Sequence, residues 1–196
     1  MIAPARIQFL KERIARHDDQ MAYKELFQSY YTPLFQFAMG FTRNRQSAEE
    51  IVSDVFISLW EKRTRLEDIS NLKLYLYTSI RNAALNYITR QNKVSITDLS
   101  ELPVEPSAIH IDPERLMITA EMKKMIAEAI QQLPARCKLI FKLVKEDDLK
   151  YREVAEILKI SVKTVEAQMT IALRKIGEAV RFDPSKTLSV GPSRKK

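Results

Sequence analysis

Near the C-terminus, a run of polar side chains carries hydrogen-bonding groups that suit the edges of DNA bases. A Lys ammonium suits guanine, a Gln amide suits adenine, and a Glu carboxylate accepts a hydrogen bond from cytosine. Farther along, Arg174 and Lys175 suit phosphate, which fixes position without reading sequence. The candidate DNA-binding set is Ser161, Lys163, Thr164, Glu166, Gln168, Arg174 and Lys175.

The element that must carry these side chains is the second helix of a helix-turn-helix. Residues 151–158 have helical apolar spacing, residues 159–161 form a turn, and residues 162–176 continue as a helix that Ser161 caps. The small Ala155 lets the two helices cross closely. This spacing predicts a helix that enters the major groove of DNA. A plain helical hairpin with a solvated polar face is the alternative.

A second group of cations and aromatic rings lies between residues 62 and 90. Single-stranded nucleic acid needs both, because rings stack on unpaired bases and cations hold the backbone. The candidate set is Lys62, Arg63, Arg65, Lys73, Tyr77, Arg81 and Asn82. The tyrosines of this region can also be interpreted as core residues, because Tyr75, Tyr77 and Tyr87 share a predicted helix over 71–90 with apolar residues typical of a core. The cations of the predicted loop over 61–70 also have a simpler explanation, because an exposed loop is commonly charged without binding nucleic acid.

Residues 47–61 form an amphipathic helix whose outward face suits a protein partner. Its apolar residues recur at three- and four-residue spacing, and Ser47 with Glu50 has the pattern of a capping box. The candidate face is acidic and partly apolar: Glu50, Ser53, Asp54 and Ile57. Trp60 has the spacing of a core residue. Earlier in the chain, Pro33 predicts a kink or a fresh start in a helix over 23–41.

The composition argues against most catalytic and cofactor chemistry. The chain has 196 residues, with one Cys, two His and three Gly. Cys137, His17 and His110 cannot assemble a zinc cluster, and no Gly-rich phosphate loop occurs. We therefore expect no enzyme activity, no catalytic residue, no metal and no cofactor. No apolar run reaches the roughly 20 residues that span a bilayer, and no secretion-signal pattern occurs, so we expect a cytoplasmic protein without membrane insertion.

Charge and proline content divide the chain into two basic helical parts. Residues 1–93 and 136–181 each have a net charge of +4, whereas residues 94–135 have a net charge of −4. The segment 94–112 shows no helical period and holds several Asp, Glu and Pro residues, which predicts a flexible acidic linker. We expect an all-α protein with two small helical domains, the second a four-helix domain that contains the helix-turn-helix. The expected domains are 1–93 and 113–181, with a disordered basic tail over 182–196.

The order of these motifs resembles the extracytoplasmic-function (ECF) group of the bacterial RNA polymerase sigma-70 family. Residues 47–60 resemble that family's second conserved region, which binds the clamp helices of the largest polymerase subunit. Residues 74–87 resemble its helix for promoter melting and minus-ten recognition. Residues 133–141 and 151–176 resemble its fourth region, which reads the minus-35 element. The resemblance covers about residues 20–180.

This resemblance implies a sigma factor that binds core RNA polymerase, recognises a two-part promoter and helps to open the DNA. The implied partners are the clamp helices, the flap of the second-largest subunit, promoter DNA and an anti-sigma factor. By similarity, the loop 62–70 holds a flipped base of the minus-ten strand, and Arg81 and Asn82 lie near the nucleic acid. Lys163, Thr164, Glu166 and Gln168 then face the minus-35 element. The acidic linker is expected to lie in a basic channel until nascent RNA displaces it.

Other functions remain open at this point. A stand-alone helix-turn-helix regulator would use residues 113–181 and bind palindromic DNA as a dimer without polymerase, which leaves the 47–61 helix and the linker unexplained. A purely structural helical adaptor would make the two basic parts incidental. The sequence also leaves open whether the two domains pack against each other in the free protein, which a linker of about 20 residues allows.

Overall fold

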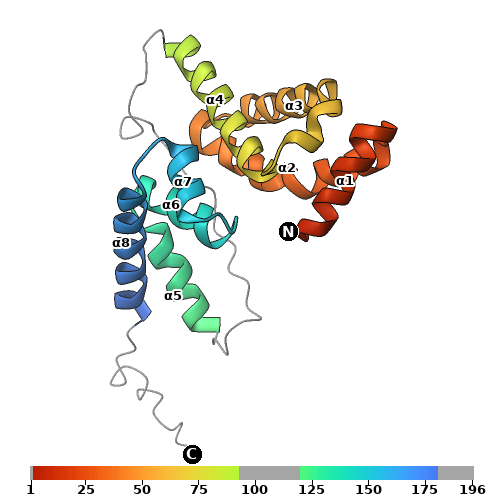
Figure 1. The fold of residues 1–196 in the computed structure, drawn as a ribbon. Coiled ribbons are helices and arrows are strands. Elements are labelled where there is room, and N and C mark those ends of the chain that lie inside the picture. Colours follow the sequence, from red (N-terminus) through yellow and green to blue (C-terminus); the bar gives the residue numbers. More distant parts are fainter. Residues whose placement is uncertain (1, 93–119, 181–196) are drawn as a thin grey trace, which may run out of the picture.

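The computed structural model describes residues 2–92 and 120–180, and the elements in these two ranges are all helical (Figure 1). The N-terminal domain holds α1 (Pro4–His17), α2 (Gln20–Thr42), α3 (Arg45–Glu61), the 3-10 helix η1 (Arg63–Asp68) and α4 (Leu72–Asn92). The C-terminal domain holds α5 (Ala120–Gln131), α6 (Ala135–Lys145), α7 (Tyr151–Leu158) and α8 (Val162–Val180). The predicted all-α fold with two domains is confirmed. The predicted linker 94–112 and tail 182–196 lie outside the described residues.

Helices α2, α3 and α4 build the core of the N-terminal domain. Each contributes one apolar face, because its inward residues recur at helical spacing. α2 buries Leu26, Leu34 and Phe37, and α4 buries Leu76 and Ile80 in the same cluster. Fully burying one such side chain contributes about 1.5–3 kcal/mol. The shared core therefore holds α3 and α4, which carry two of the candidate binding surfaces, in a fixed relation.

Pro33 does not interrupt α2, so the predicted fresh start at this residue is wrong. A proline inside a helix removes one backbone hydrogen bond and costs about 3 kcal/mol. The neighbouring Tyr30, Leu34 and Phe37 are all buried. Their packing offsets the local cost, and tertiary contacts of this kind are not visible in a local pattern.

The start of α3 also differs from the prediction. Asn44 is the N-cap, and its Oδ1 accepts a hydrogen bond from the Ser47 backbone N–H at 2.9 Å. Ser47 lies inside the helix and is buried, and its hydroxyl donates to the Tyr87 hydroxyl at 2.7 Å. The capping box of Ser47 and Glu50 is therefore wrong, because the Ser47 side chain instead ties α3 to α4.

The N-terminal helix α1 was not predicted by the pattern analysis. It buries Leu10 and Ile14, which are four residues apart, and packs along η1 and α2. Lys11 is buried beside them, with Nζ donating to the Ile69 carbonyl at 2.7 Å. Because Ile69 directly follows η1, this hydrogen bond holds the end of the loop that carries candidate DNA-binding residues.

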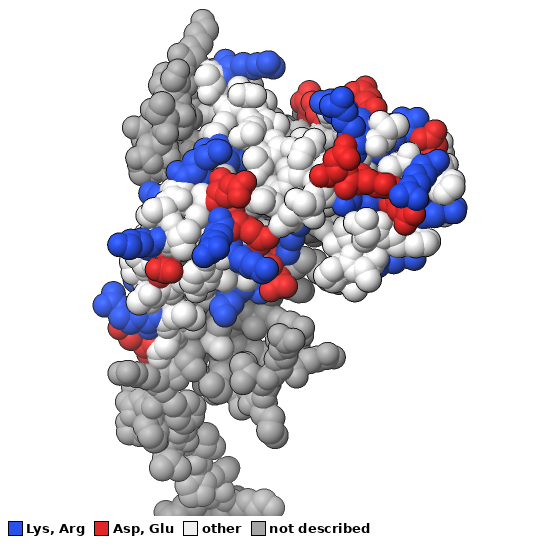
Figure 2. All heavy atoms as spheres, viewed as in Figure 1, with Lys and Arg blue, Asp and Glu red and all other residues white. Residues whose placement is uncertain are grey.

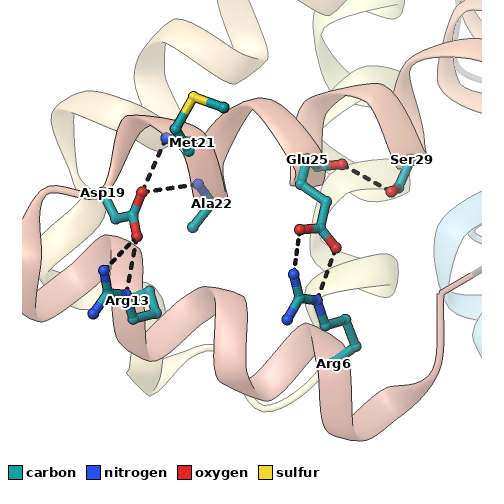
Figure 3. Close-up of polar contacts among 7 residues, drawn as sticks. All are labelled: Arg6, Arg13, Asp19, Met21, Ala22, Glu25 and Ser29. Carbon is teal, nitrogen blue, oxygen red and sulfur yellow. Dashed lines mark hydrogen bonds and ion pairs between the residues drawn. The ribbon is translucent and has the colours of Figure 1, made fainter.

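Two ion pairs join α1 to the start of α2 (Figure 3). Arg6 pairs with Glu25, and Arg13 pairs with Asp19 at 2.8 Å. The other carboxylate oxygen of Asp19 accepts two backbone N–H groups of α2 at 3.0 Å each and so caps that helix. Exposed ion pairs of this kind contribute about 0–1 kcal/mol each. They orient α1, while its buried apolar residues hold it in place.

The predicted helix-turn-helix is formed by α7 and α8. The Ser161 hydroxyl accepts the Thr164 backbone N–H at 3.0 Å, which confirms Ser161 as the cap of α8. Ala155 and Val165 are buried, as the predicted close crossing of the two helices requires. Lys159 ends α7 in the left-handed conformation and turns the chain toward α8. The N-terminus of α8 is thereby held at the surface on a rigid support.

Several turns of the chain rely on left-handed residues that are not glycine. The φ angles of Asp18, Arg43, Asp148 and Lys159 lie between 50° and 55°. Asp18, Arg43 and Lys159 end α1, α2 and α7, and Asp148 lies in the turn between α6 and α7.

The two domains pack against each other in this structure (Figure 1). α7 contacts α4, and the buried apolar residues of both domains belong to one continuous cluster. The contact is completed by hydrogen bonds between the domains, one of which runs from Lys142 on α6 to Gln36 on α2. The arrangement that the sequence left open is therefore a closed one.

Candidate nucleic-acid interface

The first turns of α8 carry the side chains predicted to read bases. Lys163 and Glu166 are exposed, whereas Thr164 and Gln168 are half-buried. Ser161 is exposed, but its hydroxyl is engaged locally, since it accepts the Thr164 N–H and lies 2.9 Å from the Thr164 hydroxyl. The arrangement can offer an ammonium, a carboxylate and an amide to a groove, with Ser161 serving the helix start.

The opposite side of α8 is held against α6. The Cys137 thiol donates to the Gln168 backbone carbonyl at 3.2 Å, and burial raises the pKa of this thiol, which keeps it protonated. Farther along α8, Arg174 is exposed and lies 3.9 Å from Glu178, while Lys175 is half-buried. Both cations lie farther along α8 than the side chains predicted to read bases, and their contact with phosphate stays a prediction.

The predicted minus-ten loop contains the short helix η1. Lys62 and Arg65 are exposed. Arg63 is already engaged, because its guanidinium donates to Asp18 and lies 4.8 Å from the centre of the Trp60 ring. The same hydrogen bond lowers the pKa of the Asp18 carboxyl. Two of the three predicted loop cations thus face solvent, and the third joins the loop to α1.

Arg81 and Asn82 lie next to each other on α4. Asn82 is exposed, whereas Arg81 is half-buried, and Arg81 Nη1 donates to Asn82 Oδ1 at 3.2 Å. Partial burial lowers the pKa of the Arg81 guanidinium. The pair forms a polar unit in which Asn82 is the more accessible member.

Tyr77 on α4 is buried, and Lys73 on the same helix contacts the C-terminal domain. Tyr77 is only 1% exposed and packs on the Phe37 ring, with centroids 5.1 Å apart. Lys73 Nζ donates to the Asp148 backbone carbonyl at 3.3 Å, and burial lowers the pKa of this ammonium. Both residues were predicted to contact DNA. In this closed arrangement Tyr77 is buried, whereas Lys73 is half-buried and engaged by Asp148.

The other two tyrosines of α4 are also partly committed to packing. Tyr87 accepts the hydrogen bond from Ser47, and Tyr75 is half-buried against the apolar cluster. The alternative interpretation of these rings as core residues therefore holds for Tyr77 and, in part, for Tyr75 and Tyr87.

The predicted partner-binding residues share one exposed stripe of α3. Glu50, Ser53, Asp54 and Ile57 are all exposed, and Ile57 retains 56% of its surface. Their spacing of three, four and seven residues places them on one side of the helix. A large apolar side chain left open beside two carboxylates suits a protein partner that offers both apolar and basic groups.

A shallow hollow of about 380 Å³ adjoins this stripe and was not predicted. It is lined by Gln20, Tyr23, Ile57 and Trp60. The rings of Tyr23 and Trp60 meet edge to face at 4.8 Å, and the Tyr23 hydroxyl donates to the Phe56 carbonyl at 2.5 Å. Burial raises the pKa of Tyr23 to about 12. Trp60 is half-buried, so it belongs both to the core edge and to this hollow.

Basic side chains are distributed over the C-terminal domain. On the face shown in Figure 2, Lys and Arg alternate with Asp and Glu, and an uncharged stretch separates this domain from the charged N-terminal end. Any attraction to a polyanion therefore comes from separate small groups of Lys and Arg side chains, because Asp and Glu side chains lie between these groups.

Fold and surface together define an all-α protein with a helix-turn-helix in one domain and an exposed acidic, apolar stripe in the other. None of the helices within 2–92 and 120–180 is both long and apolar enough to cross a membrane. Residues 26–94 match the family Sigma-70 region 2, and residues 123–176 match the family Sigma-70, region 4.

Curated relatives match across nearly the whole chain. The RNA polymerase sigma-H factor of Pseudomonas aeruginosa is 23% identical over 188 residues, which are 92% of this chain and 97% of that protein. The ECF RNA polymerase sigma-E factor of Escherichia coli is 25% identical over 181 residues, which are 89% of this chain and 94% of that protein.

Two solved structures have a similar fold. A sigma factor RpoE from Bartonella quintana, solved with the anti-sigma factor NepR, has a TM-score of 0.51 and 20% identity, over 82% of this chain and 98% of that one. CnrH, solved with the cytosolic domain of CnrY, has a TM-score of 0.50 and 18% identity. The match covers 88% of this chain and 96% of that chain. At these identities the likeness supports the fold alone.

The chain belongs to the ECF group of the sigma-70 family. It is a sigma factor, and this family consists of transcription initiation factors that act with core RNA polymerase on promoter DNA and catalyse no reaction themselves. The stand-alone regulator is not favoured, because that alternative would use only residues 113–181, whereas the matches extend over both domains.

Proposed function

We propose that this sigma factor uses three separate surfaces to direct promoter-specific initiation. The first turns of α8 read the minus-35 element, η1 and α4 bind the melted minus-ten strand, and the stripe Glu50, Ser53, Asp54 and Ile57 binds the clamp helices of the largest polymerase subunit. The observation that carries the proposal is that one chain matches both sigma-70 regions and exposes candidate side chains in each.

Strand opening follows from differential binding. Unpaired bases gain contacts on η1 and α4 that duplex DNA cannot make, so binding shifts the equilibrium toward the open form. No covalent bond forms or breaks in this scheme, and the chain is accordingly not an enzyme. It acts in the cytoplasm, where its polymerase partner works.

The C-terminal domain also contacts the flap of the second-largest polymerase subunit, and an anti-sigma protein restrains the free chain. Support for the anti-sigma partner comes from the two solved relatives, whose structures contain NepR and CnrY. The exposed Ile57 and the hollow beside it offer an apolar surface that such a protein would cover.

Transcription in vitro tests this function directly. Purified chain and core polymerase are combined with a library of genomic promoter fragments, and the transcripts are sequenced. We expect initiation at a defined set of sites that share two spaced elements. Absence of promoter-specific initiation on every template would contradict the proposal.

The substitution Asp54→Arg tests the polymerase-binding stripe. A cation in place of an exposed carboxylate should repel a basic partner surface and weaken the complex by about 2 kcal/mol or more. The measurement is the affinity of full-length chain for core polymerase. Glu128→Arg is the matched control, because it makes the same charge change at an exposed position on α5. Equal affinities for the two variants would exclude this face as the docking site.

A further inference from the structure

The short helix η1 and the residue on either side of it form two distinct faces. A 3-10 helix has three residues per turn, so residues three apart lie on the same face. One face is buried or half-buried and consists of Arg63, Leu66 and Ile69. Another face is exposed and consists of Lys62, Arg65 and Asp68. Two cations of the proposed minus-ten set, Lys62 and Arg65, thus lie on the exposed face.

Helix α1 contacts η1 at its start, near its end and directly after it. At the start, the Arg63 guanidinium donates to Asp18, the residue that ends α1. Near the end, Arg16 donates two hydrogen bonds to the Glu67 carboxylate, at 2.8 and 3.2 Å, and a pair of this kind fixes orientation as well as distance. Lys11 donates to the backbone carbonyl of the residue directly after η1 at 2.7 Å. α1 therefore holds η1 at three points along its length.

The contact made by Lys11 is unusual for a core position. Lys11 is only 3% exposed, and its ammonium donates to two neutral acceptors, the Ile69 carbonyl and Gln8 Oε1 at 3.2 Å. Burying an ammonium is costly unless it is hydrogen-bonded, and an apolar side chain would fill the same space at lower cost. The use of a lysine here indicates a requirement on the position of the chain that leaves η1.

This support comes from outside the region shared with the family. The match to Sigma-70 region 2 covers residues 26–94, which include η1 but not α1. The loop of the shared region is thus fastened by an element that precedes that region. A loop already held in its binding shape loses less conformational entropy when a ligand binds.

We propose that α1 is a positioning element for recognition of the melted strand, with Lys11 and Arg16 as positioning residues. They hold η1 in the shape in which its exposed cations meet the DNA, and they do not contact the strand themselves. The inference rests on the proposed function, because it requires that η1 binds single-stranded DNA.

Two double variants with the same chemical changes separate positioning from net charge. The contact variant, Lys11→Met with Arg16→Gln, removes two of the three polar contacts between α1 and η1. The control variant, Lys24→Met with Arg13→Gln, removes the same two cations and an ion pair to Asp19 but leaves these contacts to η1 intact. None of the four substituted residues belongs to the proposed DNA-binding or polymerase-binding sets.

Hydrogen–deuterium exchange on the full chain measures how firmly η1 is held. The Arg65 backbone N–H donates to the Lys62 carbonyl at 2.9 Å, and the Ile69 N–H donates to the next carbonyl along, at 3.3 Å. Both amides report on the shape of η1. They should exchange about fivefold faster in the contact variant than in the control variant, because local opening becomes easier. Equal exchange would overturn the inference.

Fluorescence anisotropy then gives the affinity of the full chain for a labelled random-sequence single-stranded oligodeoxynucleotide. The contact variant should bind about fivefold more weakly than the control variant, because the competent shape of η1 is less populated. Equal strand affinities would overturn the inference even if exchange differs. Both variants should bind core polymerase equally, since the stripe on α3 is unchanged. An equal loss of polymerase affinity in the contact variant would show a merely structural role and also overturn the inference. Arg16→Gln alone, at an exposed position, should show the same changes in smaller measure and serves if the double variant does not fold.

Failure of the inference is distinguishable from failure of the proposed function. The parent chain and both double variants are also assayed with core polymerase in the transcription experiment above. If all three initiate equally at promoters and bind the strand equally, α1 is no positioning element and the proposed function stands. If exchange and strand binding differ as expected but none initiates, positioning is supported and the role in initiation is rejected.

Discussion

At the scale of single residues, the candidate side chains differ in how far they are engaged within the chain. Lys163 and Glu166 on α8 are exposed, so the proposed contact with DNA requires no rearrangement of these side chains. Arg63 is held by Asp18, and Lys73 is held by Asp148, so each must exchange an internal contact for an external one. The proposed minus-35 residues are thus exposed in this structure, whereas part of the proposed minus-ten set is engaged in internal contacts.

The base-reading assignment predicts a change of preference as well as a loss of affinity. Lys163→Ala or Gln168→Ala should alter discrimination at one minus-35 position by about 1–3 kcal/mol, because each removes a hydrogen bond to a base edge. Binding to promoters that differ by single bases measures this. Lys175→Ala serves as the comparison and should weaken all sequences alike through a lost phosphate contact. If Lys163→Ala instead weakens binding to all promoter sequences equally, Lys163 contacts phosphate and does not read a base.

At the scale of elements, periodicity predicted the helices that bury one clean face. The helix-turn-helix is of this kind, since α7 buries Val154, Ile157 and Leu158 on one side. The wrong predictions share one cause. The hydroxyl of Ser47 is used by Tyr87, and Pro33 is tolerated because of its buried neighbours. Contacts between residues distant in sequence decided both.

Those parts of the candidate site that depend on local spacing could be predicted, and those that depend on contacts between distant residues could not. The exposed stripe of α3 follows from spacing alone, and its residues lie where they were expected. The sequence left two interpretations of Tyr77 open, a core residue or a DNA contact, because spacing alone does not show that its ring packs on Phe37 of α2. The apolar spacing of Leu10 and Ile14 could have revealed α1, although its role in holding η1 rests on polar contacts such as that of the buried Lys11.

The hydrogen bond from Lys11 predicts a stability effect that belongs to α1 and η1. Lys11→Met removes the donor to the carbonyl of the half-buried Ile69, which should lower the free energy of unfolding by about 1 kcal/mol. Urea denaturation measures this quantity. Lys24→Met makes the same chemical change at an exposed position on α2 and should change stability little. A loss no larger than that of the control would show that the Lys11 contact is dispensable.

At the scale of the whole molecule, closure is linked to proton binding. Asp147 faces Tyr77 and Lys73 from α4 and Lys142 from α6, and its pKa is raised from the ordinary 3.8 to about 6. The closed form thus holds this proton more tightly than a form in which the turn between α6 and α7 is exposed. Closure is favoured most below pH 3.8, weakens as the pH rises toward about 6, and changes no further above that value.

This linkage is expected to be visible in the dimensions of the chain. The radius of gyration should increase between about pH 4 and 6, with a contribution of about 2–3 kcal/mol to the closing equilibrium. Asp147→Asn keeps the size of the side chain but cannot ionise, so it should stay closed and lose the dependence on pH. Small-angle scattering across this range measures both chains. An unchanged pH response in Asp147→Asn would assign the effect to another group.

The left-handed residues at the helix ends have a consequence for how this chain tolerates substitution. A non-glycine residue in this conformation costs about 1–2 kcal/mol, so glycine at Asp18 or Asp148 would relax the backbone. The Asp18 carboxylate, however, receives Arg63, and the Asp148 carbonyl receives Lys73. Glycine at position 18 would relax the backbone of the turn and remove the contact that ties η1 to the end of α1. Glycine at position 148 would keep its carbonyl but loosen the turn that presents it. Engineering for thermal stability at these turns would therefore act against the contacts that hold η1 and the turn between α6 and α7 in place.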